Sequence, residues 1–241
     1  MTETLAIITG ASRGIGAGIA AAATDAGATV AACNRSSTGL EHQLNADLAD
    51  PAAWAIFAQW YDDLVASQRP DRVVFVHNSA SLTPIGPAGS VDPTAYTSHV
   101  RLNSAAPQVL GDAAIRTARA RDRPTVLLQL SSGAAGNPYP GWSGYCASKA
   151  AVEMWVRTVA TETTDDDLVR VAAVRPGIVA TEMQAEIRSS EPSEFPNVER
   201  FRDLHAGGAL ADPAAVGATI WGLAQDGGWE NGAILDVTTL G

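Results

Sequence analysis

The sequence feature that most constrains the fold is the glycine-rich segment TGASRGIG, residues 9–16, near the N-terminus. An apolar run, residues 5–9, leads into it, and an alanine-rich stretch that ends at Gly27 follows. Gly10, Gly14 and Gly16 permit a tight turn and let backbone N–H groups approach a pyrophosphate at the start of a helix. A second apolar run, residues 29–33, completes a strand–helix–strand unit. The segment therefore predicts a dinucleotide-binding site.

The rest of the chain repeats this alternation of apolar runs and helical stretches. Further runs without polar alternation occupy residues 72–77, 125–130, 168–174 and 233–237, as expected of strands buried on both faces of a parallel sheet. Three helix starts are marked by an N-capping aspartate followed by proline, at Asp50, Asp92 and Asp212. The pattern predicts an α/β protein, a single-domain Rossmann-type doubly wound parallel sheet over residues 1–241 with helices on both faces.

Composition and charge exclude several classes of function. The formal net charge of −10 and pI near 4.7 argue against nucleic acid as a partner, because such partners require a basic surface. No apolar run is long enough to span a membrane, and the N-terminus lacks the pattern of a signal peptide. The two cysteines, Cys33 and Cys146, and the four histidines share no metal-ligand spacing. We therefore expect a cytoplasmic protein with free thiols and no metal.

The segment from residue 130 to residue 155 carries the residues that suggest catalysis. Tyr145 and Lys149 are four residues apart, so they share one face of a helix, and Ser132 lies thirteen residues before the tyrosine. A phenol with a pKa near 10 is a poor acid–base catalyst at neutral pH, but a neighbouring ammonium would lower that pKa. Each residue alone has a purely structural explanation; behind a dinucleotide loop, the three together indicate proton transfer.

With these motifs the sequence resembles the short-chain dehydrogenase/reductase family over nearly its whole length. The resemblance rests on the glycine loop, Asn103 in RLNSAAP, Ser132 at the end of the run at 125–130, YCASK, and RPGIVATEM at 175–183. GWSGYCASKAA, TPIGP and PGIVATEMQ resemble more narrowly the branch containing sepiapterin reductase and benzil or dicarbonyl reductases. The resemblance implies a homodimer or homotetramer, with the helices around Asn103 and Tyr145 at the interface.

The resemblance also implies roles for individual residues. Tyr145 would be the general acid, Lys149 would lower its pKa and hold the nicotinamide ribose, and Ser132 would orient the substrate carbonyl. Asn103 would kink its helix and hold a water that links Lys149 to solvent. With Tyr145 and Lys149, the residues implied to bind the cofactor are Gly10, Ser12, Arg13, Gly14, Ile15, Gly16, Asn34, Arg35, Asp47, Leu48, Asn78, Ala80, Pro176, Gly177, Ile178 and Thr181.

Residues 34–35 decide which dinucleotide is expected. An acidic residue at the end of the second strand accepts the ribose hydroxyls of NAD, whereas a 2′-phosphate needs a cation. Asn34 and Arg35 stand there, and Arg13 in the glycine loop can approach the same phosphate. Either arginine could simply be a solvated surface charge. Together, and with no acidic residue at the end of the second strand, the two arginines favour NADP(H) over NAD(H).

Two segments depart from the family pattern. Only eight residues separate Cys33 from His42, fewer than a parallel crossover usually needs, so its helix should be missing or reduced to a turn. That leaves the sheet edge and the adenine pocket more open. The segment HNSA, residues 77–80, stands where the family commonly has Asn-Asn-Ala-Gly, and Ala80 adds a methyl group near the expected ribose. Both departures leave open how tightly the dinucleotide binds.

The substrate pocket is the least determined part of the site. Tyr139, Pro140 and Trp142 precede Tyr145 and are candidate walls of an apolar cleft, with Leu82, Thr83 and Met183 opposite. Asp236 falls where sepiapterin reductase carries a pterin-anchoring acid. The polar, proline-containing stretch at 181–212 predicts either a solvated loop with a little helix or, as we favour, a lid over the substrate.

These observations predict an NADPH-dependent oxidoreductase that reduces a ketone, aldehyde or 1,2-dicarbonyl to an alcohol by hydride transfer. One alternative is an NAD(P)-dependent alcohol dehydrogenase that works in the oxidative direction. A second is a catalytically silent, dinucleotide-sensing protein with the same fold. A methyltransferase is a third, but its glycine loop does not predict Tyr145 and Lys149.

Overall fold

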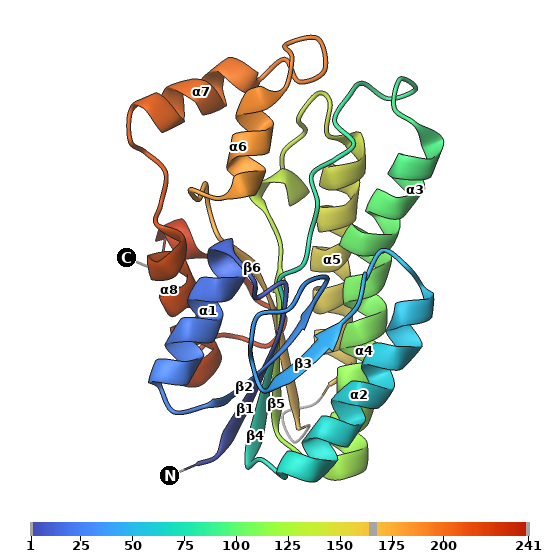
Figure 1. The fold of residues 1–241 in the computed structure, drawn as a ribbon, viewed down its shortest axis with the longest axis vertical. Coiled ribbons are helices and arrows are strands. Elements are labelled where there is room, and N and C mark those ends of the chain that lie inside the picture. The colour runs from blue at the N-terminus through green and yellow to red at the C-terminus, as the bar shows by residue number, and fades with distance from the viewer. Residues whose placement is uncertain (1, 164–167, 240–241) are drawn as a thin grey trace.

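The strands of the computed structural model, which describes residues 2–163 and 168–239, form one central sheet (Figure 1). They are β1 (Thr4–Thr9), β2 (Thr29–Asn34), β3 (His42–Asn45), β4 (Arg72–His77), β5 (Thr125–Leu130), β6 (Val169–Arg175) and β7 (Ile234–Asp236). Within the described residues all seven are parallel, in the order β3-β2-β1-β4-β5-β6-β7. This order confirms the doubly wound α/β fold.

Helices cover both faces of the sheet (Figure 1). They are α1 (Gly14–Asp25), α2 (Ala52–Gln68), α3 (Pro93–Val100), α4 (Ala106–Arg121), α5 (Ser143–Glu162), α6 (Glu182–Ser189), α7 (Val198–Ala206) and α8 (Pro213–Asp226). A π-helical turn, Arg101–Ala105, joins α3 to α4, and 3-10 turns lie at Gly133–Ala135 and Val237–Thr239. In Figure 1, α6 and α7 stand above the sheet at the end where its strands point.

The aspartate–proline pairs begin helices as predicted. Asp92 and Asp212 cap α3 and α8, accepting hydrogen bonds from the N–H groups of Ala95 at 2.7 Å and Ala215 at 2.8 Å. Asp50 accepts from the N–H of Ala52 at 3.0 Å, and α2 begins at Ala52. Each carboxylate satisfies one of the N–H groups that a helix start leaves free.

Alternate residues of each central strand supply two separate cores. In β1, Leu5 and Ile7 pack with residues of α2, α4 and α5, whereas Ala6 and Ile8 pack with residues of α1 and α8. All four side chains are fully buried, so the strand reads as a continuous apolar run. Each large aliphatic side chain buried in this way contributes about 2 kcal/mol through the hydrophobic effect.

The connection between β2 and β3 contains no helix in the described chain, as the short spacing predicted. β3 still pairs parallel with β2, from Ala31 opposite His42 to Asn34 opposite Asn45. Gln43 holds the connection: its Oε1 accepts from the Thr38 N–H at 2.8 Å and its Nε2 donates to Ser37 Oγ at 3.0 Å. Hydrogen bonds from the Gln43 side chain thus stabilise this connection, which contains no crossover helix.

Helices α1 and α8 cross in backbone contact. A Cβ atom on Gly18 would lie 2.6 Å from the carbonyl oxygen of Pro213, and one on Gly217 would lie 2.4 Å from the carbonyl carbon of Gly18. No side chain fits between the two helices at this point, so their spacing depends on both glycines.

We expect Gly217→Ala to lower the free energy of unfolding by about 1–3 kcal/mol, because the new methyl group forces the helices apart. Gly222→Ala in the same helix is the matched control, since its Cβ would meet nothing within 4 Å. That change should raise stability by about 0.5–1 kcal/mol through helix propensity. Urea unfolding measures both, and shifts of the same sign would contradict the crossing described here.

Candidate active site

The glycine loop lies between β1 and α1 and presents the start of the helix to the site. A Cβ atom on Gly16 would lie 2.1 Å from the carbonyl oxygen of Gly10, so the first turn of α1 packs directly on the loop backbone. No described side chain caps α1 and its first turn contains no acidic residue. Its free N–H groups and the positive end of the helix dipole therefore fit an anion such as a pyrophosphate.

The side chains of Asn78 and Asn34 form hydrogen bonds with the backbone of the glycine loop. The Asn78 amide donates to the carbonyl oxygens of Thr9 at 3.2 Å and Gly10 at 2.9 Å. The Asn34 side chain, expected at the adenosine end of the cofactor, is buried, and its Oδ1 accepts from the Ala11 N–H at 2.7 Å. It therefore points into the loop, because an N–H freed by the tight turn needs an acceptor.

The charged residues expected around the adenosine differ in their partners. Arg35 is exposed after β2, whereas Arg13 forms an ion pair with Glu182, the first residue of α6, that the sequence analysis did not anticipate. Asp47 is exposed and accepts from the Ala49 N–H at 3.0 Å, and Leu48 beside it is buried. Arg13 thus links the glycine loop to the start of α6.

His77, which departs from the family pattern, lies buried at the end of β4. Burial and the nearby positive charge of Lys149 lower the pKa of His77 to about 3, so its ring is uncharged at neutral pH. Its Nε2 is buried without a hydrogen-bond partner among the described residues. Ala80, three residues later, is half-buried.

Ser132, Tyr145 and Lys149 meet where β5 ends and α5 begins. Tyr145 is 7% exposed, and burial raises its pKa to about 12 although a hydrogen bond with the Ser132 side chain acts in the opposite direction. The Lys149 Nζ lies 5.7 Å from the centre of the Tyr145 ring and donates to the Leu130 carbonyl at 2.7 Å. Burial lowers the pKa of Lys149 to about 8.

The net direction of the Tyr145 pKa is upward, because burial outweighs the hydrogen bond with Ser132. The predicted lowering of this pKa by the Lys149 ammonium stays a prediction. At neutral pH the pair is therefore a neutral phenol beside an ammonium group. In that state Tyr145 can donate a proton to an oxygen placed next to it. Lys149 is also the only lysine in the chain.

Asn103 lies in the π-helical turn between α3 and α4, which is the helix distortion expected there. Its side chain pairs with both backbone groups of Ser81, accepting from the N–H at 3.0 Å and donating to the carbonyl at 2.8 Å. Sequence reasoning missed His99, one turn earlier, whose Nδ1 lies 3.1 Å from the Asn103 amide nitrogen. The His99 ring packs edge-on to Tyr145 at 6.2 Å, and its burial lowers its pKa.

A cavity of about 330 Å³ opens beside Ser132 and Tyr145. Trp142 stacks on Phe195 with ring centres 4.3 Å apart and planes 4° from parallel, and Phe201 packs against both rings. Leu82, Tyr139, Trp142, Met183 and Asp236, the proposed substrate residues, all line this cavity. Thr83, by contrast, is exposed and directs its carbonyl to His99.

The segment at 181–212 forms one side of the cavity. It contains two helices, α6 and α7, rather than a loop with a little helix, because buried Ile187, Phe195 and Phe201 anchor it on the aromatic cluster. Thr181 caps α6, accepting from the Gln184 N–H at 3.4 Å. The turn after β6 also reaches the cavity, with Pro176, Gly177, Ile178 and Thr181 among the lining residues, together with Ile15 of α1.

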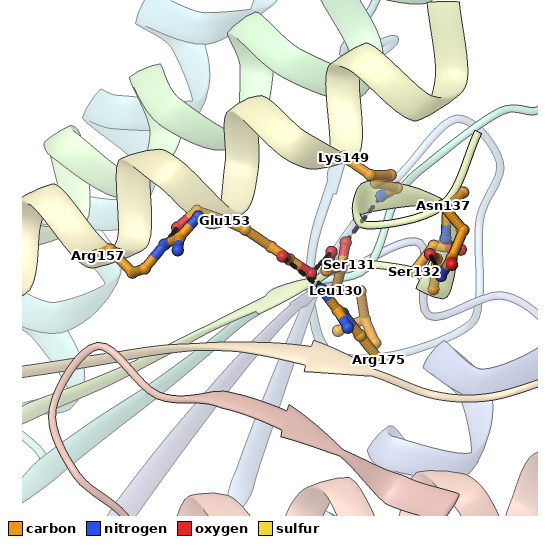
Figure 2. Close-up of polar contacts among 10 residues, drawn as sticks. Leu130, Ser131, Ser132, Asn137, Lys149, Glu153, Arg157 and Arg175 are labelled. Atoms are coloured by element: carbon orange, nitrogen blue, oxygen red, sulfur yellow. Dashed lines mark hydrogen bonds and ion pairs between the residues drawn. The ribbon is translucent and has the colours of Figure 1, made fainter. Parts of the chain in front are cut away.

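A second polar cluster, which the sequence analysis did not identify, consists of Glu153, Arg175 and Ser131, the residue before Ser132 (Figure 2). The Glu153 carboxylate accepts two hydrogen bonds from Arg175, from Nε and Nη2, each at 2.7 Å. It also accepts one from the Ser131 hydroxyl at 2.8 Å. The only available signal was spacing: Tyr145, Lys149 and Glu153 follow one another at intervals of four on one face of a helix.

Within the described ranges, no cluster of three or more His, Cys, Asp or Glu residues could hold a metal ion. Cys33 and Cys146 are free thiols, as expected. None of the helices described is long and apolar enough to cross a membrane.

Comparisons with known proteins agree with the motifs. The family model described as short chain dehydrogenase matches residues 4–192. A benzil reductase ((S)-benzoin forming) of Bacillus subtilis (strain 168) is 37% identical over 238 residues, covering 97% of this chain and 98% of the relative. A sepiapterin reductase of Bos taurus is 28% identical over 258 residues, covering 97% and 94%. The crystal structure of KRED1-Pglu enzyme matches with a TM-score of 0.83 and 28% identity, covering 96% of this chain and 100% of that one.

Proposed function

The chain belongs to the short-chain dehydrogenase family of oxidoreductases, and we propose that it reduces a ketone, aldehyde or 1,2-dicarbonyl to an alcohol with NADPH. The observation that carries the proposal is that Ser132 and Tyr145 line one cavity while Lys149 is buried behind the tyrosine. The family binds a nicotinamide dinucleotide, and the free N-terminus of α1 is suited to its pyrophosphate.

In the proposed reaction, each residue acts on the carbonyl oxygen or its proton. A nicotinamide dinucleotide held at this site would supply the hydride that adds to the carbonyl carbon. Tyr145 donates its phenolic proton to the oxygen, and Ser132 holds that oxygen in place by a hydrogen bond. The Lys149 ammonium stabilises the phenolate that remains, which would otherwise be costly in a buried site. A proton from solvent, passed by way of Lys149 and Asn103, restores the phenol.

The cavity favours an aromatic or dicarbonyl substrate. Its walls include Tyr139, Trp142 and Phe201, which offer ring faces and edges for stacking, and Leu82 closes one side. A volume of about 330 Å³ is at the lower end of the range for small-molecule sites. The Bacillus subtilis relative is named for benzil, a diketone with two phenyl rings, which is consistent with this choice.

The proposed cofactor contacts come from the segments that follow β1, β3, β4 and β6. Gly10, Ser12, Gly14, Ile15 and Gly16 would hold the pyrophosphate, and Asp47 with Leu48 would contact the adenine. The nicotinamide half would lie against Asn78, Ala80, Pro176, Gly177, Ile178 and Thr181. Asn34 would act indirectly, because its side chain supports the loop. The preference for NADPH rests on Arg13 and Arg35, and on the absence of an acidic side chain at residues 34–37.

Subunit association is a further part of the proposal. Val109 on α4 and Met154 on α5 are 39% and 56% exposed, and a homodimer or homotetramer through these two helices would cover them. Sedimentation velocity tests this directly, and a monomer at micromolar concentration would contradict it. A cytoplasmic location remains a prediction from the sequence.

We expect Tyr145→Phe to lower kcat/KM for carbonyl reduction by about 10²–10⁴-fold, because the proton donor is lost. Its affinity for NADPH should stay within a factor of about two, since the ring and its packing are retained. Steady-state NADPH oxidation with a panel of aryl ketones, aldehydes and 1,2-diketones measures the first quantity, and fluorescence titration the second.

The same assays on the wild-type protein distinguish the proposed reductase from the alternative functions. A wild type that binds NADPH but reduces no carbonyl would indicate the dinucleotide sensor. Faster oxidation of the corresponding alcohols than reduction at neutral pH would indicate the alcohol dehydrogenase.

For the cofactor, we expect Arg13→Ala and Arg35→Ala each to weaken NADPH binding about tenfold and to leave NADH binding unchanged, because only NADPH carries the 2′-phosphate. Glu182→Gln should strengthen NADPH binding modestly by releasing Arg13. Arg116→Ala is the control, an exposed arginine paired with Asp112 on α4. Fluorescence titration gives all the constants, and a wild-type preference for NADH would overturn the assignment.

A further inference from the structure

The ion pair between Glu153 and Arg175 is less exposed than the other ion pairs described. The Glu153 side chain is 6% exposed and that of Arg175 26%, whereas the side chains of the other pairs are 29–68% exposed. The guanidinium group offers two parallel N–H donors to one carboxylate, an arrangement that fixes orientation as well as distance. Ser131 occupies a further lone pair of the same carboxylate.

The cluster joins the three elements that carry the candidate active site. Glu153 lies on α5, two helical turns after Tyr145 and one after Lys149. Ser131 follows β5 and directly precedes Ser132, and its N–H donates to the Val174 carbonyl of β6 at 2.7 Å. Arg175 ends β6 and directly precedes Pro176. Figure 2 shows the Glu153 carboxylate reaching down from α5 to meet both strand ends.

The cluster also contributes charge close to Lys149. Lys149 lies on α5 one helical turn after Tyr145 and one before Glu153, and its positive charge also acts on His77 of β4 and His99 of α3. Burial favours the uncharged forms of both histidines and of Tyr145. Asp236 of β7 is opposite Arg175 in the sheet register. Glu153, one helical turn from Lys149, and its partner Arg175 therefore form a pair of opposite charges beside this part of α5.

We propose that Glu153 and Arg175 are positioning residues of this site: their pair sets α5 against the ends of β5 and β6, and because its two charges balance, neither acts alone on the Lys149 ammonium. The proposal rests on the proposed reductase function, because its kinetic consequence is the placement of Tyr145 relative to Ser132. Neither residue needs to touch the substrate. Removing one partner would leave the other as an uncompensated buried charge.

The single lysine provides a direct readout of this environment. Protein labelled with ¹³C only in lysine gives a single Cε resonance, whose pH dependence reports the pKa of Lys149 without any assay of activity. In the wild type the midpoint should lie at about 8. Glu153→Gln leaves an unpaired positive charge and should lower the midpoint by about one pH unit, and Arg175→Met should raise it by a similar amount.

Three further variants separate charge from geometry. The double variant Glu153→Gln/Arg175→Met removes both charges and should return the midpoint to within about 0.3 units of the wild type. Arg175→Lys keeps the charge but loses the two-pronged contact, so its midpoint should be unchanged while kcat falls at least about tenfold. Arg157→Met is the matched control: within the described part of the chain, the hydrogen bond of this exposed α5 arginine goes to the Glu153 backbone carbonyl, at 3.4 Å, and not to its carboxylate. It should leave both quantities unchanged.

The same variants decide between this proposal and a purely structural role. Midpoint shifts of the same sign in the two single variants, or none, would overturn it, as would wild-type kcat in Arg175→Lys. If a single variant does not fold, the double variant and Arg175→Lys carry the test. A wild type that reduces no carbonyl refutes the proposed function instead, and the lysine titration then still tests the electrostatic part.

Discussion

The site depends on one buried positive charge, the Lys149 ammonium held against the carbonyl of Leu130. A buried ammonium is costly, and its surroundings show how that cost is limited. The Leu130 carbonyl accepts one of its protons, His77 and His99 favour their uncharged forms, and Glu153 is matched by Arg175. The result is a lysine with a pKa near 8 beside a tyrosine with a pKa near 12.

This pair suits reduction better than a tyrosine whose pKa is simply lowered. A phenol that stays protonated at neutral pH is ready to donate, and the ammonium becomes useful once the proton has left. Burial thus determines the resting state, and Lys149 acts on the state that follows transfer. The aromatic wall of Trp142, Phe195 and Phe201, together with α6 and α7, would keep water from the same place.

Features set by short-range rules could be read from the sequence. The apolar runs, the aspartate–proline helix starts and the glycine loop each depend on a few neighbouring residues, and the structure has them where they were expected. The absence of a crossover helix between β2 and β3 could be predicted from the short connection between them. Tyr145 and Lys149 lie together because a helix brings residues four apart onto one face.

Pairs that lie far apart in the sequence could not be found in this way. Arg13 meets Glu182 across the loop, and Asn34 turns to Ala11, because tertiary packing decides which partner a side chain reaches. Glu153 and Arg175 are 22 residues apart, and no local pattern predicts that they meet. The upward direction of the Tyr145 pKa likewise depends on burial, which spacing does not reveal.

The central claim is that this site delivers hydride to a carbonyl carbon while Tyr145 supplies the proton. Incubating the protein with NADPH deuterated at both C4 positions of the nicotinamide and an aryl 1,2-diketone, then measuring the mass of the product by mass spectrometry, tests it directly. We expect a hydroxyketone with one deuterium on the carbinol carbon, formed about 10²–10⁴-fold more slowly by Tyr145→Phe than by the wild type. Product without deuterium, or equal transfer by the variant, would contradict it.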